Sequence, residues 1–164
     1  RLERRRRRLI GCACAASVAA TCSWRCRVAV SFRIWTRQTG RPISVRVVVY
    51  DTVEDLQRAA SHYRGEPSAE FENAQAISQP RIHFRIDEDG TEIKGTSAGV
   101  VRLCRGQGAS ILSHEMVHMA LAIYREDMGK ASLRNMKNEE TLAHIVSDLV
   151  RAANRKMWAL GVYV

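Results

Sequence analysis

The sequence predicts an α+β domain in which a small antiparallel sheet packs against two long helices. Residues 43–50 (ISVRVVVY) are rich in β-branched side chains, which is typical of a strand. In residues 82–86 apolar side chains alternate with polar and basic ones, which indicates a half-buried second strand. Residues 111–124 and 142–157 carry apolar side chains at helical spacing. This order of strands and helices favours the α+β class.

The first half of this domain is predicted from turn and cap signals. Asp51-Thr52 can cap a helix that ends near Gly65, and residues 66–79 are polar and irregular. Asp89-Gly90 is a strong hairpin signal, with residues 91–94 as a short return strand. Residues 99–104 (GVVRLC) form a further strand.

The second half is predicted to hold both long helices. Ser110 is the expected cap of the first, which runs to about Met128, with Gly129 suited to its C-terminal position. Asn138 is the expected cap of the second, which Gly161 ends.

The charge is concentrated in residues 1–42. They hold eleven Arg, no Lys and one acid, a net charge of +10, whereas residues 43–164 hold 15 Lys+Arg and 16 Asp+Glu, a net charge of −1. We therefore expect residues 1–42 to be a basic Cys/Arg/Ala-rich extension, ill-ordered or not native to the domain, and residues 43–164 to be the domain. We expect the domain not to bind nucleic acid, because the basicity lies outside it.

The basic segment also bears on the cellular compartment of the protein. Residues 1–20 have the layout of a signal peptide, which would make the protein secreted. Without that signal, the single domain cysteine, Cys104, favours a reducing, cytoplasmic location. The spacing of Cys12, Cys14, Cys22 and Cys26 does not match the usual paired zinc knuckle. No apolar run reaches the ~18 residues needed for a membrane span, and the sequence does not indicate an oligomeric state.

The chemistry is indicated by His114-Glu115-Met116-Val117-His118, an H-E-x-x-H motif within the predicted helix. Positions i and i+4 share a helix face, so the two His can hold one metal ion between them. Glu115 then lies beside the metal, where it can take a proton from the water that the metal activates. The surrounding helix is apolar almost all round, which predicts that all three polar side chains are buried and satisfied by a bound cation.

A third ligand is needed, because catalytic zinc usually has three protein ligands and one open position. The extension H-x-x-G-x-x-H is absent, since Leu121 and Tyr124 stand at its Gly and final His positions. Glu139 and Glu140, on the next predicted helix, offer the alternative of a carboxylate ligand.

The combination of H-E-x-x-H with Glu140-Thr141-Leu142-Ala143, an E-x-x-A sequence on a following helix, resembles the gluzincin metallopeptidases, in particular their minimal phage and bacterial forms. The resemblance implies a zincin-like fold, Zn²⁺ as cofactor, a peptide or protein substrate, and Glu140 as third ligand beside His114 and His118. Glu139 remains an alternative ligand. His144, one turn after Glu140, and Asp148 are candidates for supporting the ligands, and Tyr124 and Arg125 for stabilising an oxyanion.

The predicted function is zinc-dependent hydrolysis of peptide bonds, with Glu115 as general base. If the strand at residues 99–104 forms the sheet edge, it can align an extended peptide. Two other interpretations stay open. One is a deformylase-like site with Cys104 as third ligand. The other is a regulatory or nucleic-acid-binding module that uses the basic N-terminal arm and a structural metal site. A deaminase is excluded because P-C-x-x-C is absent.

Overall fold

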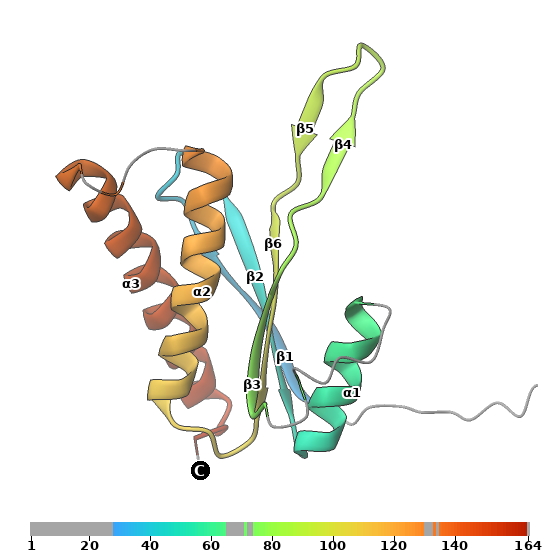
Figure 1. Cartoon of the computed structure of the whole chain (residues 1–164). Helices are drawn as coiled ribbons and strands as arrows, with labels where there is room; N and C mark the ends of the chain where they lie inside the picture. Colours follow the sequence, from blue (N-terminus) through green and yellow to red (C-terminus); the bar gives the residue numbers. More distant parts are fainter. Residues whose placement is uncertain (1–27, 65–70, 72–73, 130–132, 134, 164) are drawn as a thin grey trace, which may run out of the picture.

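The computed structural model describes residues 28–64, 71, 74–129, 133 and 135–163 (Figure 1). They form an α+β fold, as predicted, in which a mixed sheet and a small hairpin are combined with helices. The strands are β1 (Val28–Thr36), β2 (Ile43–Tyr50), β3 (Ala76–Pro80), β4 (Phe84–Ile86), β5 (Glu92–Lys94) and β6 (Ser97–Cys104). The helices are α1 (Val53–Arg64), α2 (Ala109–Met128) and α3 (Met136–Ala159).

The main sheet has the order β1-β2-β6-β3 and is mixed, not antiparallel as expected. β1 pairs with β2, and β3 with β6, in antiparallel fashion, whereas the central strands β2 and β6 are parallel. A parallel pair needs a long crossover, and here the chain between the two strands passes through α1, β3 and the β4–β5 hairpin. Strand periodicity carries no information about this direction.

β1 corrects the predicted domain boundary after residue 42. It pairs with β2 along its length, from Val28 opposite Tyr50 to Thr36 opposite Ile43, so residues 28–42 belong to the folded domain. The alternation of Val28, Val30, Phe32 and Ile34 was a usable strand signal, but arginines on both sides obscured it. Residues 28–164 hold 18 Lys+Arg and 16 Asp+Glu, a net charge of +2. The signal-peptide interpretation and the four N-terminal cysteines lie outside the described residues.

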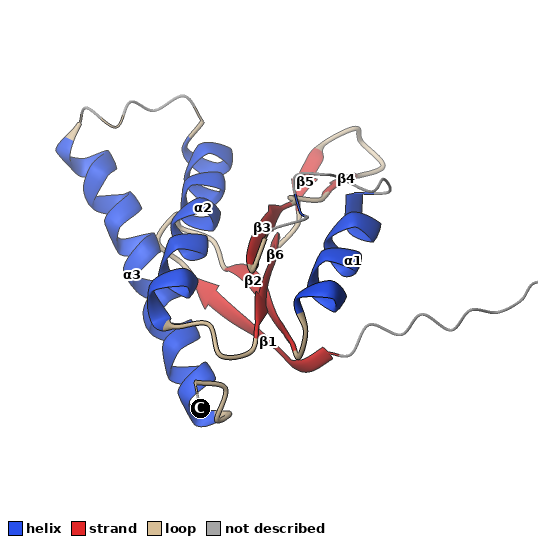
Figure 2. Cartoon of the chain, turned by 60° about the horizontal axis from the view of Figure 1, so that its bottom comes forward, coloured by secondary structure: helices blue, strands red, loops and turns tan. Residues whose placement is uncertain are grey.

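Helices cover both faces of the sheet. α2 and α3 lie against one face and α1 against the other (Figures 1 and 2). The central strand β2 is buried on both faces, since Val45, Val47 and Val49 belong to the core under α2 and α3, while Val48 and Tyr50 belong to the core under α1. This two-sided burial explains why residues 43–50 are apolar almost without interruption.

Several local expectations are corrected by the structure. The β4–β5 hairpin forms with the predicted turn, but every residue of both strands is exposed, so β4 is not half-buried. Residues 76–79, expected to be irregular, form β3 together with Pro80. Gly108 precedes α2 in place of a Ser110 cap. α3 is capped by Asn135, whose side chain accepts a hydrogen bond from the Lys137 N–H, and not by Asn138.

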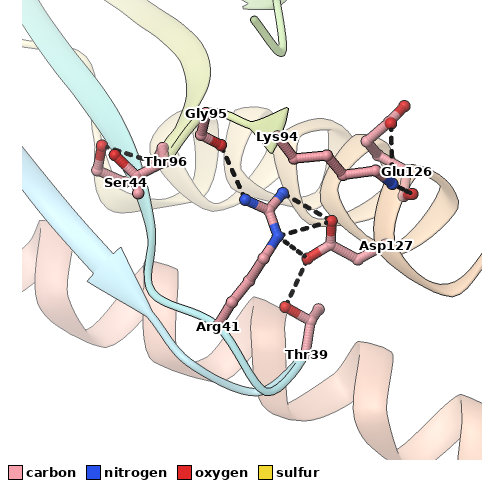
Figure 3. Close-up of polar contacts among 8 residues, drawn as sticks. All are labelled: Thr39, Arg41, Ser44, Lys94, Gly95, Thr96, Glu126 and Asp127. Atoms are coloured by element: carbon pink, nitrogen blue, oxygen red, sulfur yellow. Dashed lines mark hydrogen bonds and ion pairs between the residues drawn. The ribbon is translucent and has the colours of Figure 1, made fainter. Parts of the chain in front are cut away.

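The C-terminal end of α2 is fixed to the sheet by a polar network (Figure 3). The Arg41 guanidinium, from the turn between β1 and β2, donates to both carboxylate oxygens of Asp127 at 2.7–3.0 Å and to the Gly95 carbonyl at 2.8 Å. Thr39 adds a hydrogen bond to Asp127 at 2.7 Å. Partial burial on its own raises the pKa of Asp127, but the Arg41 and Thr39 hydrogen bonds outweigh it and hold this pKa below its ordinary value.

Within the described part of the chain, none of the helices combines the length and apolar character that a membrane span requires.

Candidate active-site cleft

His114 and His118 meet on one side of α2, as the i, i+4 spacing predicts. Their Nε2 atoms lie 3.1 Å apart and the rings meet edge to face, with centroids 4.8 Å apart. Both side chains are exposed, which corrects the expectation that they are buried. The two imidazoles therefore present nitrogen atoms to solvent at a shared point.

The spacing of these two nitrogens fits a zinc ion. Two imidazole nitrogens at about 2.0–2.1 Å from a tetrahedral zinc lie roughly 3.3 Å from each other. The observed separation of 3.1 Å is close to this value. Imidazole nitrogen is also a preferred ligand of zinc, so the two His match in chemistry as well as in geometry.

Glu115 is the buried polar residue of the motif, with 8% of its surface exposed. The Ser78 hydroxyl on β3 lies 2.6 Å from Glu115 Oε2 and 2.8 Å from the Glu115 main-chain oxygen. A hydroxyl carries one proton, so Ser78 donates to one of these acceptors at a time. The contact fixes the Glu115 carboxylate against β3 while the two imidazoles stay exposed.

A cleft of about 710 Å³ runs between β3 and α2. Its walls include Ile77, Ser78 and Pro80 on the strand side, and Glu115, His118, Leu121, Ala122 and Arg125 on the helix side. β3 is the edge strand beside this cleft, and the strand expected there, β6, lies inside the sheet between β2 and β3. The condition that residues 99–104 form the sheet edge is therefore not met, and β3 occupies that position.

Glu140 lies apart from the two His. Its carboxylate contacts His144 Nε2 at 3.1 Å, one turn further along α3, and both side chains are more than half exposed. Glu139 is also exposed. Among the described residues, no group of three or more His, Cys, Asp or Glu lies close enough to hold a metal ion. The structure thus brings together His114 and His118, holds the Glu115 carboxylate against Ser78 of β3, and pairs Glu140 with His144.

The remaining candidates, Asp148, Tyr124 and Arg125, lie in different parts of the structure. The Asp148 carboxylate accepts hydrogen bonds from Thr36, the last residue of β1, and from Gln38, which follows the strand, and it pairs with Arg151. These contacts do not orient His114 or His118. Tyr124 is buried in the core, whereas Arg125 lines the cleft. Arg125 is therefore the one of this pair that can face a substrate.

Cys104 lies in the wrong layer for a deformylase-like site. It belongs to the core under α1, with Leu56 and Phe71, on the opposite face of the sheet from the core that α2 covers. Burial raises the pKa of its thiol, which disfavours the thiolate that binds metals.

Ser78 and β3 were not singled out from the sequence. The strand is only five residues long (AISQP) and follows a polar stretch, so neither length nor alternation identifies it. Only the pairing of β3 with β6 places Ser78 opposite Glu115. No protein-family model, no curated protein and no solved structure matches this chain.

Proposed function

We propose that this protein is a zinc-dependent hydrolase that cleaves peptide bonds, with His114 and His118 as metal ligands and Glu115 as general base. The observation that carries the proposal is the convergence of the two imidazoles, 3.1 Å apart, on a helix whose Glu115 and His118 line an open cleft. A zinc ion held there would polarise a peptide carbonyl and acidify water.

The chain's own residues supply the proton transfer. Glu115 accepts a proton from the attacking water and returns it to the leaving amine. Ser78 is a positioning residue, because its hydroxyl holds the Glu115 carboxylate at 2.6 Å. Arg125, at the cleft wall, offers a cation for the oxyanion that develops on the carbonyl.

The peptide specificity of the proposal rests on β3. An edge strand has one row of unpaired main-chain groups, which can pair with an extended peptide. Pro80, at the end of β3, lacks an N–H and limits this pairing to the rest of the strand. A peptide aligned in this way would pass along the cleft that contains Glu115 and His118.

Glu140 is the proposed third ligand, with Glu139 as the alternative. Its contact with His144 joins two exposed groups and is therefore weak, so it would oppose little the movement that Glu140 needs to reach the two His. In that arrangement His144 would support the ligand that it already contacts.

The test measures zinc content and peptide hydrolysis of the full chain side by side. Glu115→Gln is expected to keep zinc but lose hydrolysis, while Glu126→Gln, an isosteric change on the same helix outside the cleft, keeps both. His114→Ala together with His118→Ala is expected to abolish zinc binding. Full hydrolysis by Glu115→Gln would refute the role of general base.

The third ligand is assigned by comparing Glu140→Ala with Glu139→Ala. Loss of zinc from the first variant alone supports Glu140, and loss from the second alone transfers the role to Glu139. Zinc retained by both single variants and by the double variant would show that neither carboxylate is a ligand.

A second candidate function is binding of a nucleic acid strand, with the metal site structural. A groove of about 780 Å³ between β1 and α3 is lined by Arg37, Arg155 and Lys156, by the Arg151–Asp148 ion pair, and by the half-exposed Trp35. Basic groups with an exposed aromatic ring suit phosphates and a stacked base. Arg155→Gln should weaken oligonucleotide binding and lower its salt dependence, unlike Arg85→Gln on the β4–β5 hairpin. If both variants weakened oligonucleotide binding equally, the binding would depend on net charge alone and the groove would not be the binding site.

A further inference from the structure

A third cavity lies on the face of the sheet that α1 covers, opposite the face that α2 covers. It has a volume of about 320 Å³ and is lined by three arginines from three strands, Arg33 (β1), Arg46 (β2) and Arg102 (β6), together with Tyr50 and Tyr63. Among the described residues its lining contains no Asp or Glu. The cavity therefore presents a local charge of +3 without an acidic side chain.

The strand register explains why the arginines gather there. Arg33 is the cross-strand partner of Arg46, and Val48, two residues further along β2, is the partner of Arg102. Side chains two residues apart on a strand project from the same face. All three guanidinium groups thus belong to one face of three neighbouring strands.

Arg102 is the unusual member, because it is 92% buried without an acidic partner. Its exposed fraction is 8%, and its contacts are with Gln79 Oε1 at 2.8 Å, the Tyr50 hydroxyl, and the rings of Tyr50 and Tyr63. Within the described chain it forms no ion pair with a carboxylate. A guanidinium has five N–H donors, and the two hydrogen bonds use two of them.

The facing arginines Arg33 and Arg46 are a second source of unfavourable electrostatic energy in the folded protein. Like charges directly opposite each other on neighbouring strands destabilise a sheet. Arg46 is held in place by a hydrogen bond from its Nε to Ser31 Oγ at 3.0 Å, and no acid on this row compensates the pair in the described residues. A buried cation and two facing cations oppose folding unless an anion offsets them.

We propose that this cavity is a binding site for the phosphate group of a small molecule. Arginine forks match phosphate oxygens in a bidentate manner, and three cations favour a doubly charged anion over a singly charged carboxylate. The cavity is larger than a phosphate ion and has the size of a small-ligand pocket, with the Tyr63 ring beside the guanidinium of Arg102. The site is independent of the zinc proposal, because it lies on the other face of the sheet.

The experiment titrates the full chain with inorganic phosphate, and separately with phenyl phosphate, at constant ionic strength, and follows binding by calorimetry. Acetate serves as the singly charged comparison. Saturable binding of phosphate, with weaker binding of acetate, is expected. Tighter binding of phenyl phosphate than of inorganic phosphate identifies an organic phosphate as the ligand class, and equal binding identifies free phosphate. Absence of saturable phosphate binding overturns the proposal.

Variants locate the site. Arg33→Gln with Arg46→Gln is expected to weaken phosphate binding at least about tenfold, since each lost charged hydrogen bond contributes on that scale. The matched control is Arg85→Gln with Arg105→Gln, which removes the same charge from exposed arginines outside the cavity and should leave affinity unchanged. Equal losses in both double variants would overturn the site. Arg102→Met should abolish binding, and the exposed double variant decides the result if Arg102→Met does not fold.

Discussion

Replacing Asp127 by Asn tests whether the clamp between the β1–β2 turn and α2 stabilises the helix that carries the motif. Asp127 has 6% of its side chain exposed, and Arg41 has 26% exposed. The substitution keeps the side-chain volume but removes the charge that faces three guanidinium contacts of 2.7–3.0 Å. Arg41 would keep its hydrogen bond to the Gly95 carbonyl, so it stays in place with its charge unpaired.

The expected loss is about 2 kcal/mol in the free energy of unfolding at neutral pH. Hydrogen bonds to charged groups contribute roughly 1.5–3 kcal/mol, and the solvent access of Arg41 prevents the larger loss of about 3–5 kcal/mol seen for a fully buried pair. For a domain of this size, this corresponds to a melting temperature lower by roughly 4–8 °C. Urea unfolding followed by circular dichroism measures it directly.

The pH dependence gives an independent check. The pKa of Asp127 is lowered in the folded state, so its contribution is present above the unfolded value of about 3.9 and is lost as pH falls through the folded pKa. The difference between wild type and Asp127→Asn should therefore be full at pH 7 and shrink below about pH 4. Glu126→Gln, whose partner Lys94 is more exposed, should cost less than about 1 kcal/mol. A difference that is absent at pH 7, or that persists undiminished in strong acid, would refute the reasoning.

Three further predictions concern the strands and the thiol. Gly99→Ala should cost about 3 kcal/mol or more by urea unfolding, since its φ is +127° and a Cβ would lie 2.3 Å from the Gln79 carbonyl oxygen, whereas Gly90→Ala, in open space, should cost about 1–2 kcal/mol. Equal losses of stability in the two variants would contradict the close approach of the Gln79 carbonyl to Gly99. Ser78→Ala should cost about 1–3 kcal/mol because the buried Glu115 carboxylate loses its donor, and the cost should fall in a Glu115→Ala background; a constant cost would exclude coupling. Cys104 should react slowly with iodoacetamide in the folded protein, because burial raises the pKa of its thiol; peptide mass spectrometry that finds equal labelling in native and urea-unfolded protein would contradict this.

The sequence predicted well those features that depend on local geometry. The i, i+4 spacing of His114 and His118 fixes their contact as soon as α2 forms, and the position of α2 follows from apolar spacing and Gly129. The Asp-Gly turn between β4 and β5 likewise depends only on local backbone preference, and Gly90 has the positive φ that such turns require.

The burial of the motif could not be predicted from the same pattern. α2 is apolar almost all round, which predicts a helix enclosed by protein. In the structure one apolar side, with Leu121 and Ala122, faces the cleft and not the core, and Val117 is 40% exposed. Hydrophobic periodicity reports which side avoids water, but does not distinguish a filled core from an open groove.

Features that depend on distant partners were also beyond local reasoning. Ser78 meets Glu115 across 37 positions of sequence, and this contact exists only because β3 pairs with β6. The direction of β6 relative to β2, and the placement of Glu140 beside His144, likewise follow from packing between elements and not from the spacing of residues within one element.

The open apolar side of α2 bears on what the cleft can hold. An open groove whose lining includes Leu121, Ala122 and Ala76 exposes apolar surface to water, which is unfavourable unless a ligand with apolar groups covers that surface. The same groove has an edge strand along one wall, and edge strands pair with other extended chains unless they are covered. An extended peptide with apolar side chains satisfies both demands at once, since its main chain can pair with β3 while its side chains cover α2. Such a peptide would lie beside Glu115 and His118, which line the same cleft. This joint requirement favours a peptide over a small polar substrate in the proposed reaction.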